Sequence, residues 1–192
     1  MDGSIMKETK EAVIYQLKIT LSYIRPPIWR RIQIRGDTTL AKLHRIFQLV
    51  MGWSDSHLHQ FRVGQTCYGD DPSGDEFAEV RDERKVRLDE ILRKPRQRMS
   101  YDYDFGDGWG HAIVLEKKVP CDPKTRYPIC LGGARACPPE DCGGAPGYED
   151  LLLAVRDPEH PERKELLKWL GGEFDAEEFE LEQVNFGLRS IR

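Results

Sequence analysis

The chain has 192 residues, of which 39% are hydrophobic and 32% charged, and its formal net charge is −4. This composition is that of an ordinary globular protein, and no apolar run reaches the ~20 residues that a membrane-spanning helix needs. A negative net charge argues against a protein that binds nucleic acid over its whole surface. The first residues are polar and lack the apolar stretch of a signal peptide, so we expect a cytoplasmic protein without membrane contact.

Two strands and a helix are predicted at the start of the chain. Alternating hydrophobic residues predict a strand over 13–23, and a second strand over 28–34 follows a break at two prolines, which indicates a β-hairpin. Thr38 or Thr39 can cap a helix whose apolar residues recur on one side, and Gly52 is placed to end it. We therefore expect a hairpin that leads directly into an amphipathic helix.

The middle of the chain is predicted to be mostly β-structure. Residues 57–68 have the pattern of a third strand, and the stretch 69–83, rich in Asp and Gly, that of a mobile loop. A short helical turn at 88–92 precedes two strands that flank a Gly-Asp-Gly-Trp turn and end near Val119.

The last third of the chain begins with residues 120–147, which are rich in Cys, Pro and Gly and too many for a simple connection. We expect a functional or metal-stapled loop there. Glu140 and Asp141 are interpreted as hydrogen-bond acceptors that fix this loop, because acids would repel a phosphate ligand. Helices are predicted at 148–155, from Pro161 to a stop at Gly171 and Gly172, and after a capping box formed by Asp175 and Glu178.

This order of elements predicts an α+β fold in which a helix packs on a mixed β-sheet, as in β-grasp folds, followed by a C-terminal helical region. We expect one domain after a flexible N-terminus. The expected divisions are 1–12 for the flexible N-terminus and 13–192 for the domain, with a sheet-and-helix core at 13–119, the loop at 120–147 and a helical part at 148–192.

The predicted hairpin at 101–111 gathers acids and a histidine. Alternation places Asp102 and Asp104 on one face, and a turn centred on Asp107 and Gly108 places Asp104 opposite His111. These three side chains could form a hard-metal or acid/base site. A cross-strand pair between Asp104 and His111 that sets the register is the simpler interpretation, and we prefer it. Asp107 is assigned to the turn.

Two further groups have metal-ligand chemistry. His57 and His59 are two residues apart, which places both imidazoles on one face of a strand, as in two-histidine metal sites. Strand histidines are also packed or exposed without a ligand, so this alternative stays open. Four cysteines could hold a structural zinc ion, although they lack paired Cys-x-x-Cys spacing and could equally be free thiols. These are Cys121, Cys130, Cys137 and Cys142.

The segment 12–36 contains basic side chains and no acidic one. Such residues are usually solvated, and a local nucleic-acid-binding patch is the alternative. The arginines of that patch would be Arg25, Arg30, Arg31 and Arg35.

Several short sequence motifs spread along the chain occur together in one family. They are Pro26–Arg31, Leu43 with His44, Gly52 with Trp53, His57 to Phe61, Tyr103 to Trp109, Cys137 to Asp141 with Gly143, Gly144, Gly147 and Tyr148, and Trp169 to Asp175 with Asn185. Together they resemble the plasmid pRiA4b Orf-3-like family, over about 13–188. The resemblance implies a compact α+β domain of mobile-element, bacterial or archaeal genomes with no established reaction. Some relatives carry a transposon-resolvase label, but this chain lacks a Ser or Tyr nucleophile in the arginine-rich setting that such recombination needs.

Three functions follow as expectations. The chain has no complete catalytic set, which favours a non-enzymatic binding or regulatory module associated with mobile elements, with a protein or nucleic-acid partner. The first alternative is a metal-dependent hydrolase or nuclease that uses the 102–111 hairpin, with help from His57 and His59, and a divalent ion such as zinc. The second is a local nucleic-acid-binding protein.

Overall fold

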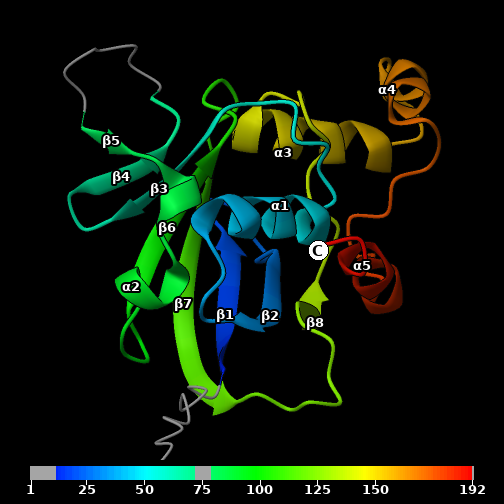
Figure 1. Cartoon of the computed structure of the whole chain (residues 1–192). Helices are drawn as coiled ribbons and strands as arrows, with labels where there is room; N and C mark the ends of the chain where they lie inside the picture. Colours follow the sequence, from blue (N-terminus) through cyan, green and yellow to red (C-terminus); the bar gives the residue numbers. More distant parts are fainter. Residues whose placement is uncertain (1–11, 72–78, 192) are drawn as a thin grey trace, which may run out of the picture.

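A computed structural model describes residues 12–71 and 79–191. Most of the predicted flexible N-terminus, and the middle of the predicted 69–83 loop, lie outside these ranges. The described residues form a mixed β-sheet with helices packed around it (Figure 1), which confirms the α+β class. No helix in the described ranges is long and apolar enough to cross a bilayer.

The sheet has eight strands in the order β5-β4-β3-β6-β7-β1-β2-β8. All neighbouring pairs are antiparallel except β4 and β5, which are parallel. The strands are β1 (Val13–Leu21), β2 (Trp29–Arg35), β3 (His59–Val63), β4 (Thr66–Gly69), β5 (Val80–Arg81), β6 (Arg98–Tyr103), β7 (Trp109–Pro120) and β8 (Ile129–Ala134).

The helices lie on and beside this sheet. In Figure 1, α1 crosses in front of β1 and β2, α3 is seen above α1 in this view, and α5 lies next to β8. The helices are α1 (Leu40–Met51), α2 (Leu88–Ile91), α3 (Gly144–Arg156), α4 (Arg163–Leu170) and α5 (Leu181–Leu188), with one 3-10 turn, η1 (Glu83–Lys85).

The opening hairpin and first helix match their predictions. β1 and β2 pair antiparallel, with Leu17 opposite Ile32. The side chain of Thr39 accepts a hydrogen bond from the Lys42 backbone N–H at the start of α1, and Gly52 ends the helix in the left-handed conformation with φ 85°. Local signals are sufficient here because an N-cap, an apolar stripe and a C-cap glycine all agree.

Two strand predictions differ from the structure. Residues 57–68 form two antiparallel strands, β3 and β4, because Gly64 adopts a φ of 60° and reverses the chain. Strand β8 lies within the predicted 120–147 loop and pairs with β2. Its sequence, with two central glycines, has little strand propensity, so the pairing with β2 decides its structure.

The C-terminal helices are confirmed in kind and differ in their boundaries. Gly171 ends α4 at the predicted stop, again in the left-handed conformation. The predicted cap at Asp175 is wrong, since α5 begins only at Leu181. Asp175 instead forms a turn, in which its carboxylate accepts a hydrogen bond from Glu177 N at 2.9 Å and its carbonyl one from Glu178 N at 3.2 Å.

Candidate metal centre

The register of the β6–β7 hairpin differs from the prediction. Tyr103 pairs with Trp109 and Tyr101 with His111, so five residues connect the strands. Asp104 is the first of these five, with a φ of 55°. Its Oδ1 accepts hydrogen bonds from the backbone N–H groups of Gly106 at 3.0 Å and Asp107 at 3.2 Å, which stabilises the longer turn. The predicted Asp104–His111 pair is therefore wrong.

This register separates the three residues of the predicted hairpin site. Cross-strand partners share a sheet face, so His111 lies with Tyr101 on the buried face. Asp102 pairs with Gly110 and points to the opposite face, where partial burial raises the pKa of its carboxyl group. Asp104 alone remains available for a site at the turn.

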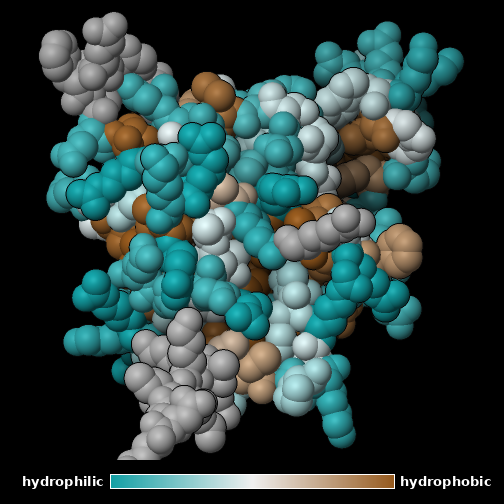
Figure 2. Space-filling view, viewed as in Figure 1, coloured by the Kyte–Doolittle hydropathy of each residue, from teal (hydrophilic) through white to brown (hydrophobic). Residues whose placement is uncertain are grey.

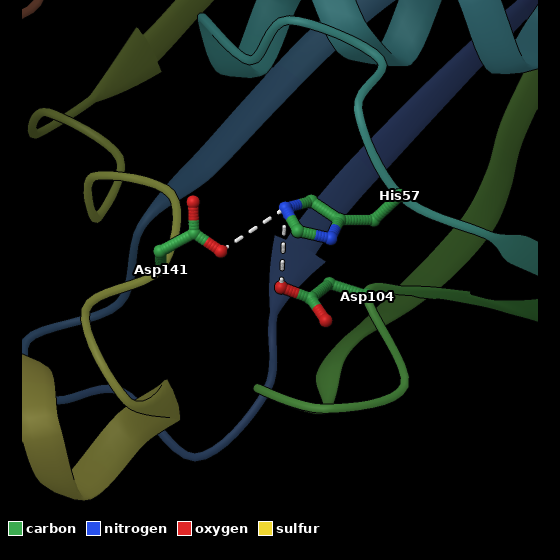
Figure 3. Close-up of side chains that lie close together, drawn as sticks. All are labelled: His57, Asp104 and Asp141. Atoms are coloured by element: carbon green, nitrogen blue, oxygen red, sulfur yellow. Dashed lines mark ion pairs between the residues drawn. The ribbon is translucent and has the colours of Figure 1, made fainter.

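Asp104 instead lies close to two residues from loops that are distant from it in the sequence. His57 precedes β3, and Asp141 lies between β8 and α3 (Figure 3). The Nε2 atom of His57 is 3.6 Å from Asp104 Oδ2 and 3.3 Å from Asp141 Oδ1. The three ligand atoms all lie within 4.8 Å of one another, and this is the one such group of metal-ligating side chains in the described part of the chain.

The two separations from His57 suit a shared metal ion. Two ligands that are each 2.0–2.1 Å from a tetrahedral ion are about 3.3 Å apart. The Nε2 atom of His57 is enclosed and has no hydrogen-bond partner. Buried polar atoms normally have a partner, so this nitrogen is available as a ligand. Asp104 is nearly buried, whereas the Asp141 side chain is 73% exposed, which leaves one side of the group open to solvent.

Backbone contacts hold His57 and Asp104 in place. The Asp104 N–H donates a hydrogen bond at 3.0 Å to the carbonyl of Leu58, the residue after His57. The His57 ring packs edge-on against Tyr103 with centroids 5.7 Å apart. Because Oδ1 of Asp104 is used within its own turn, Oδ2 faces His57.

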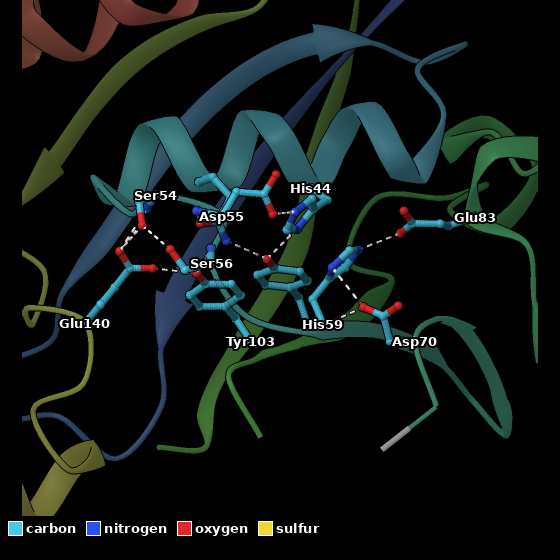
Figure 4. A network of polar contacts seen from close by, with 11 residues as sticks. His44, Ser54, Asp55, Ser56, His59, Asp70, Glu83, Tyr103 and Glu140 are labelled. Carbon is cyan, nitrogen blue, oxygen red and sulfur yellow. Dashed lines mark hydrogen bonds and ion pairs between the residues drawn. The ribbon is translucent and has the colours of Figure 1, made fainter. Parts of the chain in front are cut away.

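Glu140 anchors the loop that carries Asp141. Its carboxylate accepts hydrogen bonds from Tyr103 Oη and from both the backbone N–H and the hydroxyl of Ser54 (Figure 4). This contact confirms that Glu140 fixes the loop, as predicted. The bonded groups belong to β6 and to the segment that precedes His57, so one acid ties together the elements that carry all three site residues.

A second contact joins the Asp141 loop to the hairpin turn. Gly143 N donates a hydrogen bond to Asp107 Oδ2 at 3.1 Å, which supports the structural role predicted for Asp107. Gly144 has a φ of 67°, and a Cβ atom there would lie 2.3 Å from the Asp107 carbonyl oxygen. Only glycine allows this close approach of the two backbones.

His59 is directed away from this group. Its Nε2 lies 2.9 Å from Glu83 and its Nδ1 3.4 Å from Asp70, and its ring stacks on His44 with centroids 3.5 Å apart (Figure 4). Both of its ring nitrogens therefore face carboxylates of their own. The prediction that His57 and His59 share one ion is wrong. Only His59 lies within β3, so the two rings do not share a strand face.

The cysteines do not gather. No group of three or more metal-ligating side chains among the described residues contains a cysteine, and the described cysteines form no disulfide. Burial raises the pKa of Cys137 to about 11 and that of Cys142 to about 12, so both remain protonated thiols at neutral pH. Cys130 lies buried in β8 and Cys121 follows β7. The arrangement offers no four-cysteine zinc site.

Three of the four arginines of the predicted basic patch are engaged within the protein. Arg30 is buried, and its guanidinium donates to backbone carbonyls. Arg31 forms a two-point ion pair with Glu116, and Arg35 forms one with Asp37. Arg25 is exposed. These contacts account for Arg30, Arg31 and Arg35 without a nucleic-acid ligand.

Burial of His111 predicts a pH-dependent stability. Desolvation lowers its pKa to about 4, whereas the unfolded chain has the ordinary value near 6.5. As the pH falls, the unfolded state therefore binds a proton before the folded state does. The free energy of unfolding is unaffected by this group above about pH 6.5 and decreases by about 3 kcal/mol towards pH 4. Urea unfolding of the wild type and of His111→Leu at several pH values checks this, because the variant should lose that part of the pH dependence. His160→Gln is the matched control and should keep it; identical pH profiles for wild type and His111→Leu would contradict the account.

Of the trio formed by His57, Asp104 and Asp141, the sequence predicted the first two as metal ligands, with His57 assisting a site on the hairpin. It assigned Asp141 only to loop geometry. The signal for Asp141 was its place in the Pro-Pro-Glu-Asp-Cys-Gly-Gly phrase of the resemblance. That phrase carries both the acid that anchors the loop, Glu140, and the acid that reaches His57.

Comparisons with known proteins agree with this fold. The chain is 35% identical over 177 residues to "Uncharacterized protein y4hQ" of Sinorhizobium fredii, covering 91% of this chain and 90% of that protein. It is similar to the crystal structure of a protein of unknown function, MM3350, from Methanosarcina mazei Go1, with a TM-score of 0.80, 37% identity, and coverage of 90% of this chain and 97% of the other. The family model of the plasmid pRiA4b ORF-3-like proteins matches residues 13–183, and the chain therefore belongs to that family.

Proposed function

We propose that the protein is a metal-dependent hydrolase whose divalent ion is held by His57, Asp104 and Asp141. The observation that carries this proposal is the enclosed Nε2 of His57, which has no hydrogen-bond partner and faces two carboxylates from other elements. The group uses Asp104 of the 101–111 hairpin and His57, as the hydrolase alternative expected, but Asp141 stands in place of Asp102, His111 and His59.

The donor set favours particular ions and chemistry. One imidazole and two carboxylates suit Zn²⁺, Mn²⁺ or Fe²⁺ better than Ca²⁺ or Cu⁺. Three protein ligands with an open side are typical of catalytic rather than structural metal sites. An ion bound there would activate water and polarise a carbonyl or phosphoryl oxygen. The exposed Asp141 side gives a substrate access to that position.

A hydrolysis assay with chelation tests this proposal. Purified protein loaded with Zn²⁺ or Mn²⁺ is expected to hydrolyse p-nitrophenyl acetate or bis-p-nitrophenyl phosphate, to lose the activity with EDTA and to regain it when the ion is restored. Asp104→Asn and Asp141→Asn should lower the rate by about 100-fold or more, since each removes a ligand. Asp102→Asn should be unaffected.

Three results would contradict the hydrolase. Hydrolysis that is insensitive to EDTA, or equal in Asp104→Asn and wild type, would show that the trio is not the source of the activity. Stoichiometric metal at the trio without hydrolysis of either substrate class would favour the binding or regulatory module expected first from the sequence, with the ion as a staple between three loops.

A further inference from the structure

A cavity of about 490 Å³ lies between α3 and α4 and reaches the candidate metal centre. Asp141 belongs to both, because it lines the cavity and faces His57. The volume is in the range of small-molecule sites. The other residues used below line the cavity from α3, from α4 and from the segment between them; they are Asp150, Leu153, His160, Glu162 and Trp169.

The charge of the lining has one sign. Asp141, Asp150 and Glu162 contribute carboxylates, and the lining contains no Lys or Arg. Asp150 and Glu162 form no ion pair with another described residue. His160 accepts a hydrogen bond from Glu162 N at its Nδ1, at 3.2 Å. The cavity is therefore complementary to a positive charge.

The remaining wall is apolar and open to solvent. Trp169 is 50% exposed and Leu153 is 66% exposed. Figure 2 shows hydrophobic atoms between the regions of α3 and α4, with hydrophilic atoms around them. Large exposed apolar groups that line a concavity favour a ligand with an apolar part, and the face of an indole attracts a cation.

We propose that this cavity binds a small molecule that carries an ammonium group on a short apolar chain. The ammonium group lies between Asp150 and Glu162, and the apolar chain lies against Trp169 and Leu153. The identification of this ligand as a substrate rests on the proposed hydrolase function. A hydrolysable bond on the Asp141 side of the ligand would then lie next to the metal ion.

Binding of two matched probes to the metal-free protein tests the cavity. Phenethylamine is charged at neutral pH, and phenethyl alcohol has the same apolar part without the charge. By calorimetry or NMR titration, the amine is expected to bind about tenfold more tightly than the alcohol. The double variant Asp150→Asn/Glu162→Gln should remove this preference and leave alcohol binding unchanged. Trp169→Ala should weaken both probes.

Glu165→Gln is the matched control, since it removes an exposed acid of α4 that does not line the cavity. It should bind both probes as the wild type does. Absent binding, equal affinities for the two probes, or an amine preference that survives in the double variant would each overturn the proposal. Zn²⁺ titration of the same double variant separates the two hypotheses: unchanged metal binding with lost amine preference supports both, whereas amine binding without any metal binding overturns the hydrolase alone.

Discussion

His57→Ala is expected to weaken Zn²⁺ binding by about 100-fold or more. The imidazole is the one nitrogen ligand of the group, and its Nε2 faces both carboxylates. Even partners that only orient metal ligands are worth 10–100-fold in affinity, so loss of a ligand should cost at least as much. Calorimetric titration of metal-free protein, or competition with a chromogenic chelator, measures the change.

Asp102→Asn is the matched control for this experiment. Asp102 is a partly buried carboxylate only two residues from Asp104, but it lies within β6, on the face opposite Tyr101 and His111, and does not belong to the trio. The account predicts wild-type affinity for this variant. If Asp102→Asn lost the ion as His57→Ala does, the hairpin acids would act together, and the trio would be the wrong assignment.

Arg30→Met is expected to destabilise the protein by about 3–5 kcal/mol, because it leaves several buried carbonyl groups without a donor. The guanidinium donates to the carbonyls of Val50 at 2.8 Å, Ala134 at 2.9 Å and Arg135 at 2.8 Å. It also lies over the Phe179 ring at 4.4 Å. Arg30 thus joins the end of α1 to the end of β8. Urea unfolding measures the loss.

Arg31→Met is the comparison for Arg30→Met. Arg31 is the next residue in β2, and its guanidinium pairs with Glu116 near the surface. A third of the Arg31 side chain is exposed. Such pairs contribute about 1 kcal/mol or less, so the two variants should differ clearly in their unfolding midpoints. Equal stabilities would show that the buried hydrogen bonds of Arg30 contribute little.

The parts of the fold that local signals determine were predictable from the sequence. Helix α1 has its cap, apolar stripe and terminating glycine within its own residues. Strand β8 has none of these, because its structure depends on pairing with β2. The start of α5 was missed for a related reason, since Asp175 stabilises a turn by accepting hydrogen bonds from the backbone N–H groups of Glu177 and Glu178.

The site was predictable only in pieces. Asp104 and His57 were recognisable as metal-ligand types, but their partners were assigned from regular strand geometry. Asp104 leaves that geometry through its left-handed backbone and its hydrogen bonds within the turn, which shifts the whole register. Asp141 is held at the site by contacts that its neighbours Glu140 and Gly144 make with other loops. No sequence periodicity indicates such contacts.

The most direct test of the account is anomalous diffraction from crystals of the protein grown or soaked with Zn²⁺. We predict one dominant peak about 2.1 Å from His57 Nε2, Asp104 Oδ2 and Asp141 Oδ1, and its absence in His57→Ala crystals. A dominant ion at the cysteines or at His59, or full occupancy at the trio without contact to His57, would contradict the central claim.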